Sequence, residues 1–149
     1  MQLPLSCVNT LTKHQAALVY TQVFGIRVFP LKEGTKIPLP GTGGVHSATL
    51  DPQSIDLWWT LYPDANIGLA GGDNFDFADL DCKREGQDGL RSFVELDEDL
   101  IGRPVQHTPT GGLHVLLPAS EWMELTNFQN KGTYRGIDMR TRGGYVVGA

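Results

Sequence analysis

Residues 75–82 read Phe-Asp-Phe-Ala-Asp-Leu-Asp-Cys, a stretch in which apolar and acidic side chains are interleaved. Because successive side chains of a β-strand point to opposite faces, a strand here would place Asp79 and Asp81 together on one face and Asp76 on the other. Two carboxylates on the same face repel each other. We therefore expect a positively charged group beside Asp79 and Asp81.

A divalent metal ion is one such group. Mg²⁺ and Mn²⁺ take oxygen ligands and keep coordination positions open for substrate phosphates, so Asp79 and Asp81 are candidate metal ligands. The alternative is that one aspartate caps the next turn while the other pairs with Lys83 or Arg84. An Asp-x-Asp pattern alone is common enough to leave both interpretations open.

A third candidate ligand, Asp138, lies in an apolar and glycine-containing stretch at residues 134–140. Three aspartates on strands are what a two-metal phosphoryl-transfer site needs, because two ions together stabilise the attacking and the leaving oxygen. The alternative for Asp138 is a simple ion pair with Arg135 or Arg140.

Residues 108–114 read Thr-Pro-Thr-Gly-Gly-Leu-His and place a glycine turn directly before an apolar strand. Glycine lets backbone N–H groups come close to a phosphate, and a histidine just beyond the turn can donate a hydrogen bond to it. Gly111, Gly112 and His114 are therefore candidate phosphate-binding residues. The alternative is an ordinary hairpin that carries a surface imidazole.

The rest of the chain predicts short elements separated by turns, as 18 glycines and 9 prolines in 149 residues indicate. Helices and strands are interspersed, and paired glycines recur in hairpin-like positions at 111–112 and 143–144, so the predicted class is α+β with a mixed or antiparallel sheet and flanking helices. We expect helices from Thr12 to Gly25, from Asp51 to Pro63 and at 86–96, and strands at 26–30, 66–70, 75–81, 105–108, 113–117, 134–139 and 145–147.

The formal net charge of −5 excludes a protein that is basic throughout, such as a nucleic-acid binder of the histone type. The charges are unevenly distributed, however. Ten of the 17 acidic residues fall between Asp73 and Asp99, whereas four basic residues accompany the single acid Asp138 from Lys131 onward. An acidic centre and a basic C-terminal part remain compatible with a local basic surface.

Cysteine content and hydropathy indicate the compartment. Cys7 and Cys82 are the only cysteines and lie far apart, which favours neither a disulfide framework nor a zinc finger. No stretch has the roughly 18 consecutive apolar residues of a membrane span, and the first 30 residues lack a secretory signal pattern. We therefore expect a soluble, cytoplasmic protein that makes no membrane contact.

Taken together, these motifs resemble the N-terminal primase–polymerase domain of the archaeo-eukaryotic primase superfamily, the bifunctional kind found in plasmid, phage and prophage replication proteins. The resemblance runs in order from Ala16 to Ala149. It includes the acid-x-acid motif at 79–81, the histidine after paired glycines and the later single aspartate. Further matching segments are GIRVFPL at 25–31, Lys36, Pro38, HSAT at 46–49, Asp51, Trp58-Trp59 and YPDANIGLA at 62–70.

The resemblance assigns roles to individual residues. The three aspartates would bind Mg²⁺ or Mn²⁺, the histidine would contact the phosphates of the incoming nucleotide, and the basic residues near the end would reach phosphate or template. The expected catalytic residues are Asp79, Asp81, Asp138 and His114; the expected nucleotide- or phosphate-binding residues are Gly111, Gly112, His114, Arg140 and Arg142; the expected metal ligands are Asp79, Asp81 and Asp138.

The function implied by the resemblance is template-directed nucleotidyl transfer in DNA replication, both primer synthesis and DNA polymerisation, by a two-metal mechanism with nucleoside triphosphates as substrates. Expected partners are a single-stranded DNA template or primer–template, dNTPs or NTPs, and a replicative helicase. The expected location is the bacterial cytoplasm, or the host cytoplasm for a phage or plasmid protein. The implied fold is an RRM-like catalytic core in which residues 1–149 form one domain, shortened at its C-terminus relative to the family.

Two other functions stay open on the sequence. One is an inactive or regulatory module that binds nucleotide or single-stranded DNA. The other is a metal-dependent nuclease or phosphohydrolase that uses the same carboxylates with water as the nucleophile. The family-like segments outside the carboxylates disfavour the nuclease or phosphohydrolase.

Overall fold

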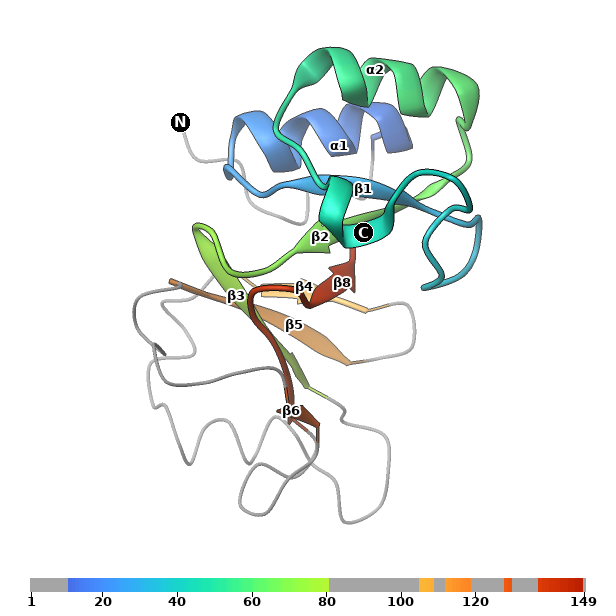
Figure 1. Ribbon diagram of the computed structural model, residues 1–149. Helices are drawn as coiled ribbons and strands as arrows, with labels where there is room; N and C mark the ends of the chain where they lie inside the picture. Colours follow the sequence, from blue (N-terminus) through green and yellow to red (C-terminus); the bar gives the residue numbers. More distant parts are fainter. Residues whose placement is uncertain (1–10, 81–104, 109–111, 119–127, 130–136, 149) are drawn as a thin grey trace.

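The computed structural model describes residues 11–80, 105–108, 112–118, 128–129 and 137–148. In this part of the chain, the fold is α+β, with two α-helices, a short 3₁₀ helix and two antiparallel sheets (Figure 1). The predicted fold class is confirmed. The elements are α1 (Lys13–Gln22), β1 (Val28–Leu31), η2 (Gly44–Ser47), α2 (Pro52–Leu61), β2 (Asn66–Ala70), β3 (Phe75–Leu80), β4 (Val105–His107), β5 (Leu113–Pro118), β6 (Phe128–Gln129), β7 (Ile137–Arg140) and β8 (Tyr145–Val147).

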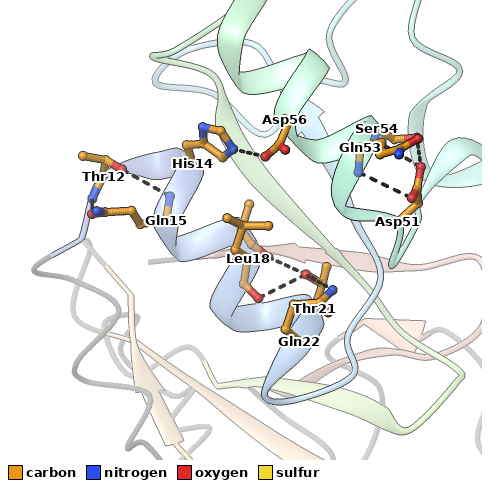
Figure 2. A network of polar contacts seen from close by, with 11 residues as sticks. Thr12, His14, Gln15, Leu18, Thr21, Gln22, Asp51, Gln53, Ser54 and Asp56 are labelled. Carbon is orange, nitrogen blue, oxygen red and sulfur yellow. Dashed lines mark hydrogen bonds and ion pairs between the residues drawn. The ribbon is translucent and has the colours of Figure 1, made fainter.

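Both helices begin at the caps that the sequence predicts. The Thr12 side chain accepts a hydrogen bond from the backbone N–H of Gln15, and the Gln15 side chain accepts one from the Thr12 N–H, which completes a capping box (Figure 2). The Asp51 side chain accepts hydrogen bonds from the N–H groups of Gln53 and Ser54 at the start of α2. These bonds satisfy backbone donors that the first turn of a helix leaves unpaired.

The two helices lie side by side on one side of β1 and β2, and the larger sheet lies on the other side (Figure 1). His14 of α1 contacts Asp56 of α2, with Nε2 and Oδ1 2.5 Å apart (Figure 2). The Trp59 ring is buried, and its N–H donates to the Ala65 carbonyl at 3.0 Å. The helices therefore form a fixed layer against which the sheets pack.

The smaller sheet has the order β1-β2-β8 and the larger one the order β4-β5-β3-β7-β6. The chain passes from the first to the second through Gly71 and Gly72. Gly72 has a φ of 98°, and a Cβ there would lie 2.5 Å from the Cα of Arg142, so only glycine fits. This bend brings β3 into the centre of the larger sheet.

Two predictions need correction. The sequence predicts one sheet, but there are two, because the Gly71-Gly72 bend separates β2 from β3. The glycine pair at 143–144 does not close a hairpin, because β7 pairs with β3 whereas β8 pairs with β2 and buries Val146 in the core under the helices. Neither η2 nor β6 was expected, and the helix expected at 86–96 lies outside the described residues.

The larger sheet buries apolar side chains on both faces. One face contributes Phe77 and Leu116 to the core under α1 and α2, and the other face carries a second cluster that includes Ala78, Leu80 and Met139. Because successive side chains of β3 point to opposite faces, each face of the larger sheet packs against a separate apolar cluster. Within the described residues, no helix is long and apolar enough to cross a membrane.

Candidate active site

A row of polar side chains crosses the larger sheet on the face that also carries Phe77. In the antiparallel register, Asp79 of β3 lies directly opposite His114 of β5 on one side and Asp138 of β7 on the other. Gln106 of β4 lies opposite His114 and extends the row. Directly opposed residues share a face and lie close together, so three strands far apart in sequence place these side chains side by side.

His114 and Asp79 are the closest pair in the row. His114 Nε2 lies 3.5 Å from Asp79 Oδ1; the imidazole side chain is 7% exposed and the carboxylate 26% exposed. Burial by itself would raise the pKa of Asp79. The hydrogen bond from His114, and the positive charges of His114, Lys36 and Arg140, outweigh burial and hold that pKa below its usual value. Asp79 is therefore ionised at neutral pH and lies near the positive charges of Lys36 and Arg140.

Lys36 is a site residue to which the sequence analysis gave no role. It lies in the loop after β1, and its charge contributes to the lowered pKa of Asp79. The Tyr145 hydroxyl of β8 donates to the Lys36 carbonyl at 2.8 Å and fixes this part of the loop. The loop has no periodicity, so only the resemblance, which contains Lys36, signalled its importance.

Asp138 forms an ion pair on its own strand. Arg140 Nη2 lies 3.6 Å from Asp138 Oδ2, and both side chains are partly exposed. The ion pair that the sequence offered as an alternative for Asp138 therefore exists. An exposed pair of this kind contributes little stability, and it does not prevent Asp138 from lying beside Asp79.

Gly112 permits a close approach of two strands at the edge of the polar row. A Cβ at Gly112 would lie 2.6 Å from the Leu80 carbonyl oxygen. The Gly112 N–H donates to Thr108 Oγ1 at 2.8 Å, and the Gly112 carbonyl accepts from the Thr108 N–H. In this structure the Gly112 amide is therefore paired within the turn. Gly111, its expected partner in phosphate binding, lies outside the described residues.

The remaining expected site residues are placed differently. Arg142 lies near the other end of β3, where its Nη2 donates to the Gly72 carbonyl at 3.3 Å. Burial raises the pKa of Asp76, and the charge of Arg142 partly opposes that rise. Arg142 is not among the groups that act on the pKa of Asp79. Asp81 lies outside the described residues. The structure thus brings together Asp79, Asp138, His114 and Arg140, and it sets Arg142 apart.

A divalent cation of the Mg²⁺ type requires several oxygen donors that converge on one point. Among the side chains that the structure describes, no group of three or more His, Cys, Asp or Glu residues is arranged to hold a metal ion. Asp79 and Asp138 occupy directly opposed positions on neighbouring strands, and the lowered pKa of Asp79 keeps it in the form that ligates. Hard cations prefer such oxygen donors. The two residues fit a divalent cation as part of a ligand set.

The sequence as a whole matches one known family. The sequence pattern of the family described as "Bifunctional DNA primase/polymerase, N-terminal" (Prim-Pol) matches residues 17–149. Comparison with the curated proteins gives no match. The family match extends over nearly all of the chain and includes each strand of the polar row. The chain therefore belongs to the Prim-Pol family of bifunctional DNA primase/polymerase N-terminal domains.

Proposed function

We propose that this protein catalyses template-directed nucleotidyl transfer in DNA replication, extending a primer and synthesising one. Membership of the family implies nucleotidyltransferase activity and binding of DNA and nucleotides at the level of the family. The observation that carries the proposal for this chain is the row that joins Asp138, Asp79 and His114 across three strands. In this proposal, residues 1–149 act as one catalytic domain.

Asp79 and Asp138, together with Asp81, would hold divalent cations, Mg²⁺ or Mn²⁺. When bound, such ions favour ionisation of the attacking hydroxyl and neutralise charge on the triphosphate. Asp79 serves this role because its lowered pKa keeps a negative charge at the centre of the sheet at neutral pH. The neighbouring strands fix the position of that charge before any substrate arrives.

The reaction joins two nucleotides. The 3′-oxygen of the primer, or of a first nucleotide in primer synthesis, forms a bond to the α-phosphorus of a nucleoside triphosphate. The bond from the α-phosphorus to its bridging oxygen breaks, pyrophosphate leaves, and the hydroxyl proton passes to solvent. Lys36, His114 and Arg140 surround Asp79 and would hold the triphosphate by its negative oxygens. The protein contributes mainly positioning and charge.

The partners follow from this reaction. A single-stranded template or a primer–template would bind along the face of the larger sheet that carries Asp79. The substrates would be dNTPs or NTPs. Arg142 and the Gly111-Gly112 turn are proposed contacts to phosphate or template. A replicative helicase of a phage, plasmid or bacterial replication system is the proposed protein partner. These assignments rest on family membership and on the charges around Asp79.

A synthesis assay tests the proposal. The protein is incubated with Mg²⁺ or Mn²⁺, labelled dNTPs or NTPs and single-stranded DNA, once with and once without an annealed primer. We expect labelled products longer than the primer, and short new oligonucleotides in its absence. Nucleotide or DNA binding without synthesis would instead establish a binding module. Shortening of labelled DNA would establish a nuclease, and either result would overturn the proposal.

A further inference from the structure

The Gln106 side chain connects the polar row to the helical layer. Its Oε1 accepts a hydrogen bond from the Tyr20 hydroxyl of α1 at 2.6 Å. Its Nε2 lies 3.2 Å from the Val147 carbonyl oxygen of β8 and 3.3 Å from His114 Nδ1. One amide therefore contacts three elements, and it contacts His114 on the side of the ring that faces away from Asp79.

These contacts fix the orientation of the amide. A carbonyl oxygen can only accept hydrogen bonds, so the atom of Gln106 that faces Val147 must be the nitrogen. The Tyr20 hydroxyl then donates to the oxygen. The amide nitrogen has two N–H groups, and its two neighbours on that side are the Val147 carbonyl and His114 Nδ1. Nδ1 therefore faces a donor and must accept.

Because the three side chains are buried, a change in the amide orientation or in the imidazole tautomer would destabilise the folded state. Tyr20 is fully buried, Gln106 is 5% exposed and His114 is 6% exposed, so water does not readily replace a lost partner. A flipped amide would set two carbonyl oxygens against each other, and an Nδ1–H tautomer would set two donors against each other. The Nε2 atom, by contrast, lies 3.5 Å from the acceptor Asp79 Oδ1.

We propose that Gln106 is a positioning residue that holds the neutral imidazole of His114 in its Nε2–H tautomer, with Tyr20 and Val147 holding Gln106. His114 then presents a hydrogen-bond donor on the side of Asp79. Its Nδ1 is engaged and does not act as a base or a metal ligand. The consequence for catalysis rests on the proposed function: the Nε2–H group would donate to a phosphate oxygen of the nucleotide.

Nitrogen NMR of the ¹⁵N-labelled protein, without metal or nucleotide, tests the tautomer directly. Spectra are recorded at an alkaline pH at which imidazoles are neutral. The His114 signals are identified by their loss in His114→Gln. We expect a pyridine-type Nδ1 and a pyrrole-type Nε2. The opposite pattern, or an even mixture of the two tautomers, would overturn the proposal.

Variants test whether Gln106 is the cause. Gln106→Met keeps the approximate length of the side chain and removes the donor, and we expect a mixture of tautomers. Gln106→Glu replaces the donor with an acceptor and should favour Nδ1–H. If the glutamate variant does not fold, the methionine variant decides. An unchanged tautomer in a folded Gln106→Met protein would contradict the assignment.

Two controls separate Gln106 from other causes. Asp79→Ala removes the acceptor near His114 Nε2. If Gln106 sets the tautomer, His114 should remain Nε2–H in this variant. Loss of the Nε2–H tautomer would assign the effect to Asp79 and overturn the proposal. His107→Gln changes an exposed neighbour on the same strand and should leave the His114 signals unchanged. A shift of those signals would mean that any change in β4 disturbs the ring, and it would overturn the specific role of Gln106.

An activity measurement adds a readout that distinguishes this inference from the proposed function. In primer extension, Gln106→Met should raise KM for the nucleotide about tenfold and change kcat less, as expected for a misdirected hydrogen bond to a charged group. An unchanged KM would contradict the catalytic consequence. If the wild-type protein synthesises nothing, the proposed function fails, whereas the tautomer result stands independently.

Discussion

Asp76 and Asp79 lie three residues apart on the same strand, and their surroundings have opposite effects on their ionisation. Asp76 is 4% exposed, and its Oδ1 has no hydrogen-bond partner among the residues that the structure describes. Burial raises the pKa of Asp76, and the Gly72 N–H and the charge of Arg142 only partly oppose this. Asp79 is also partly buried, yet the hydrogen bond and the charges around it lower its pKa.

The difference shows that burial alone does not decide the state of a carboxylate. Asp76 shares its face of β3 with the apolar cluster of Ala78 and Leu80, whereas Asp79 shares its face with His114 and Asp138. A carboxylate surrounded mainly by apolar groups destabilises the folded state when it ionises, and one surrounded by donors and cations stabilises it. Of these two carboxylates, Asp79 alone lies among groups that favour its ionised form.

The largest expected difference between the two aspartates is in activity. Asp79→Asn should lower primer extension by at least about 100-fold, because the variant loses a charge at the centre of the proposed site. The matched variant Asp76→Asn makes the same chemical change on the other face and should alter the rate less than about threefold. Equal losses in steady-state assays would remove the distinction between the two positions.

The apolar face should matter mainly for stability. Leu80 is fully buried in the second apolar cluster, so Leu80→Ala should lower the free energy of unfolding by about 2–5 kcal/mol. Arg140→Ala, on the polar face, should change the free energy of unfolding by less than about 0.5 kcal/mol. Its main effect should be weaker nucleotide binding. Urea unfolding and nucleotide titration measure both effects, and a larger stability loss for Arg140→Ala would reverse the comparison.

The two aspartates should also have opposite effects on the pH dependence of stability. A raised pKa means that folded Asp76 disfavours ionisation at neutral pH, so Asp76→Asn should raise the free energy of unfolding there by roughly 1 kcal/mol. This gain should disappear below about pH 3, where the carboxyl group is protonated in both states.

For Asp79 the sign is reversed. Its lowered pKa stabilises the folded state above the pKa of the unfolded chain, and this contribution is lost as the pH falls through the folded value. Asp79→Asn should therefore lower the free energy of unfolding at neutral pH by roughly 1 kcal/mol, and less in acid. Urea unfolding of Asp76→Asn and Asp79→Asn at several pH values provides the measurement. A gain in stability for both variants would show that the folded state disfavours ionisation of Asp79 as well.

The smallest expected effect is stabilisation by a cation. At a Mn²⁺ concentration equal to the dissociation constant, the folded state should gain about 0.4 kcal/mol, which raises Tm by about 1–3 °C. Asp76→Asn should keep this shift and Asp79→Asn should lose it. Thermal unfolding with and without Mn²⁺ measures the shift, and its persistence in Asp79→Asn would place the cation elsewhere.

The local parts of the fold could be predicted from sequence because they depend on short-range physics. The caps at Thr12 and Asp51 follow from side-chain hydrogen bonds to the next turn. The assignment of Asp76 and Asp79 to opposite faces follows from the alternation of a strand. For these features, a few neighbouring residues contain all of the necessary information.

The composition of the site depended on contacts that the sequence does not show. The register that sets Asp79 opposite both His114 and Asp138 arises from the pairing of three distant strands. Lys36 lies in a loop without periodicity, and Gln106 is an ordinary polar residue in a short strand. Their roles appear only when α1 and β8 are packed against the larger sheet.

Strand β8 fixes the site from both sides: the Tyr145 hydroxyl holds the Lys36 loop, and the Val147 carbonyl orients Gln106. Residues 145–147 are synthesised after all the other described elements. During translation, the aspartates of β3 and β7 therefore leave the ribosome before the strand that orders their neighbours. A nascent chain that stops before residue 145 would carry the carboxylates without a fixed imidazole or lysine. Among the described elements β8 thus emerges last, and its contacts with Lys36 and Gln106 can form only then.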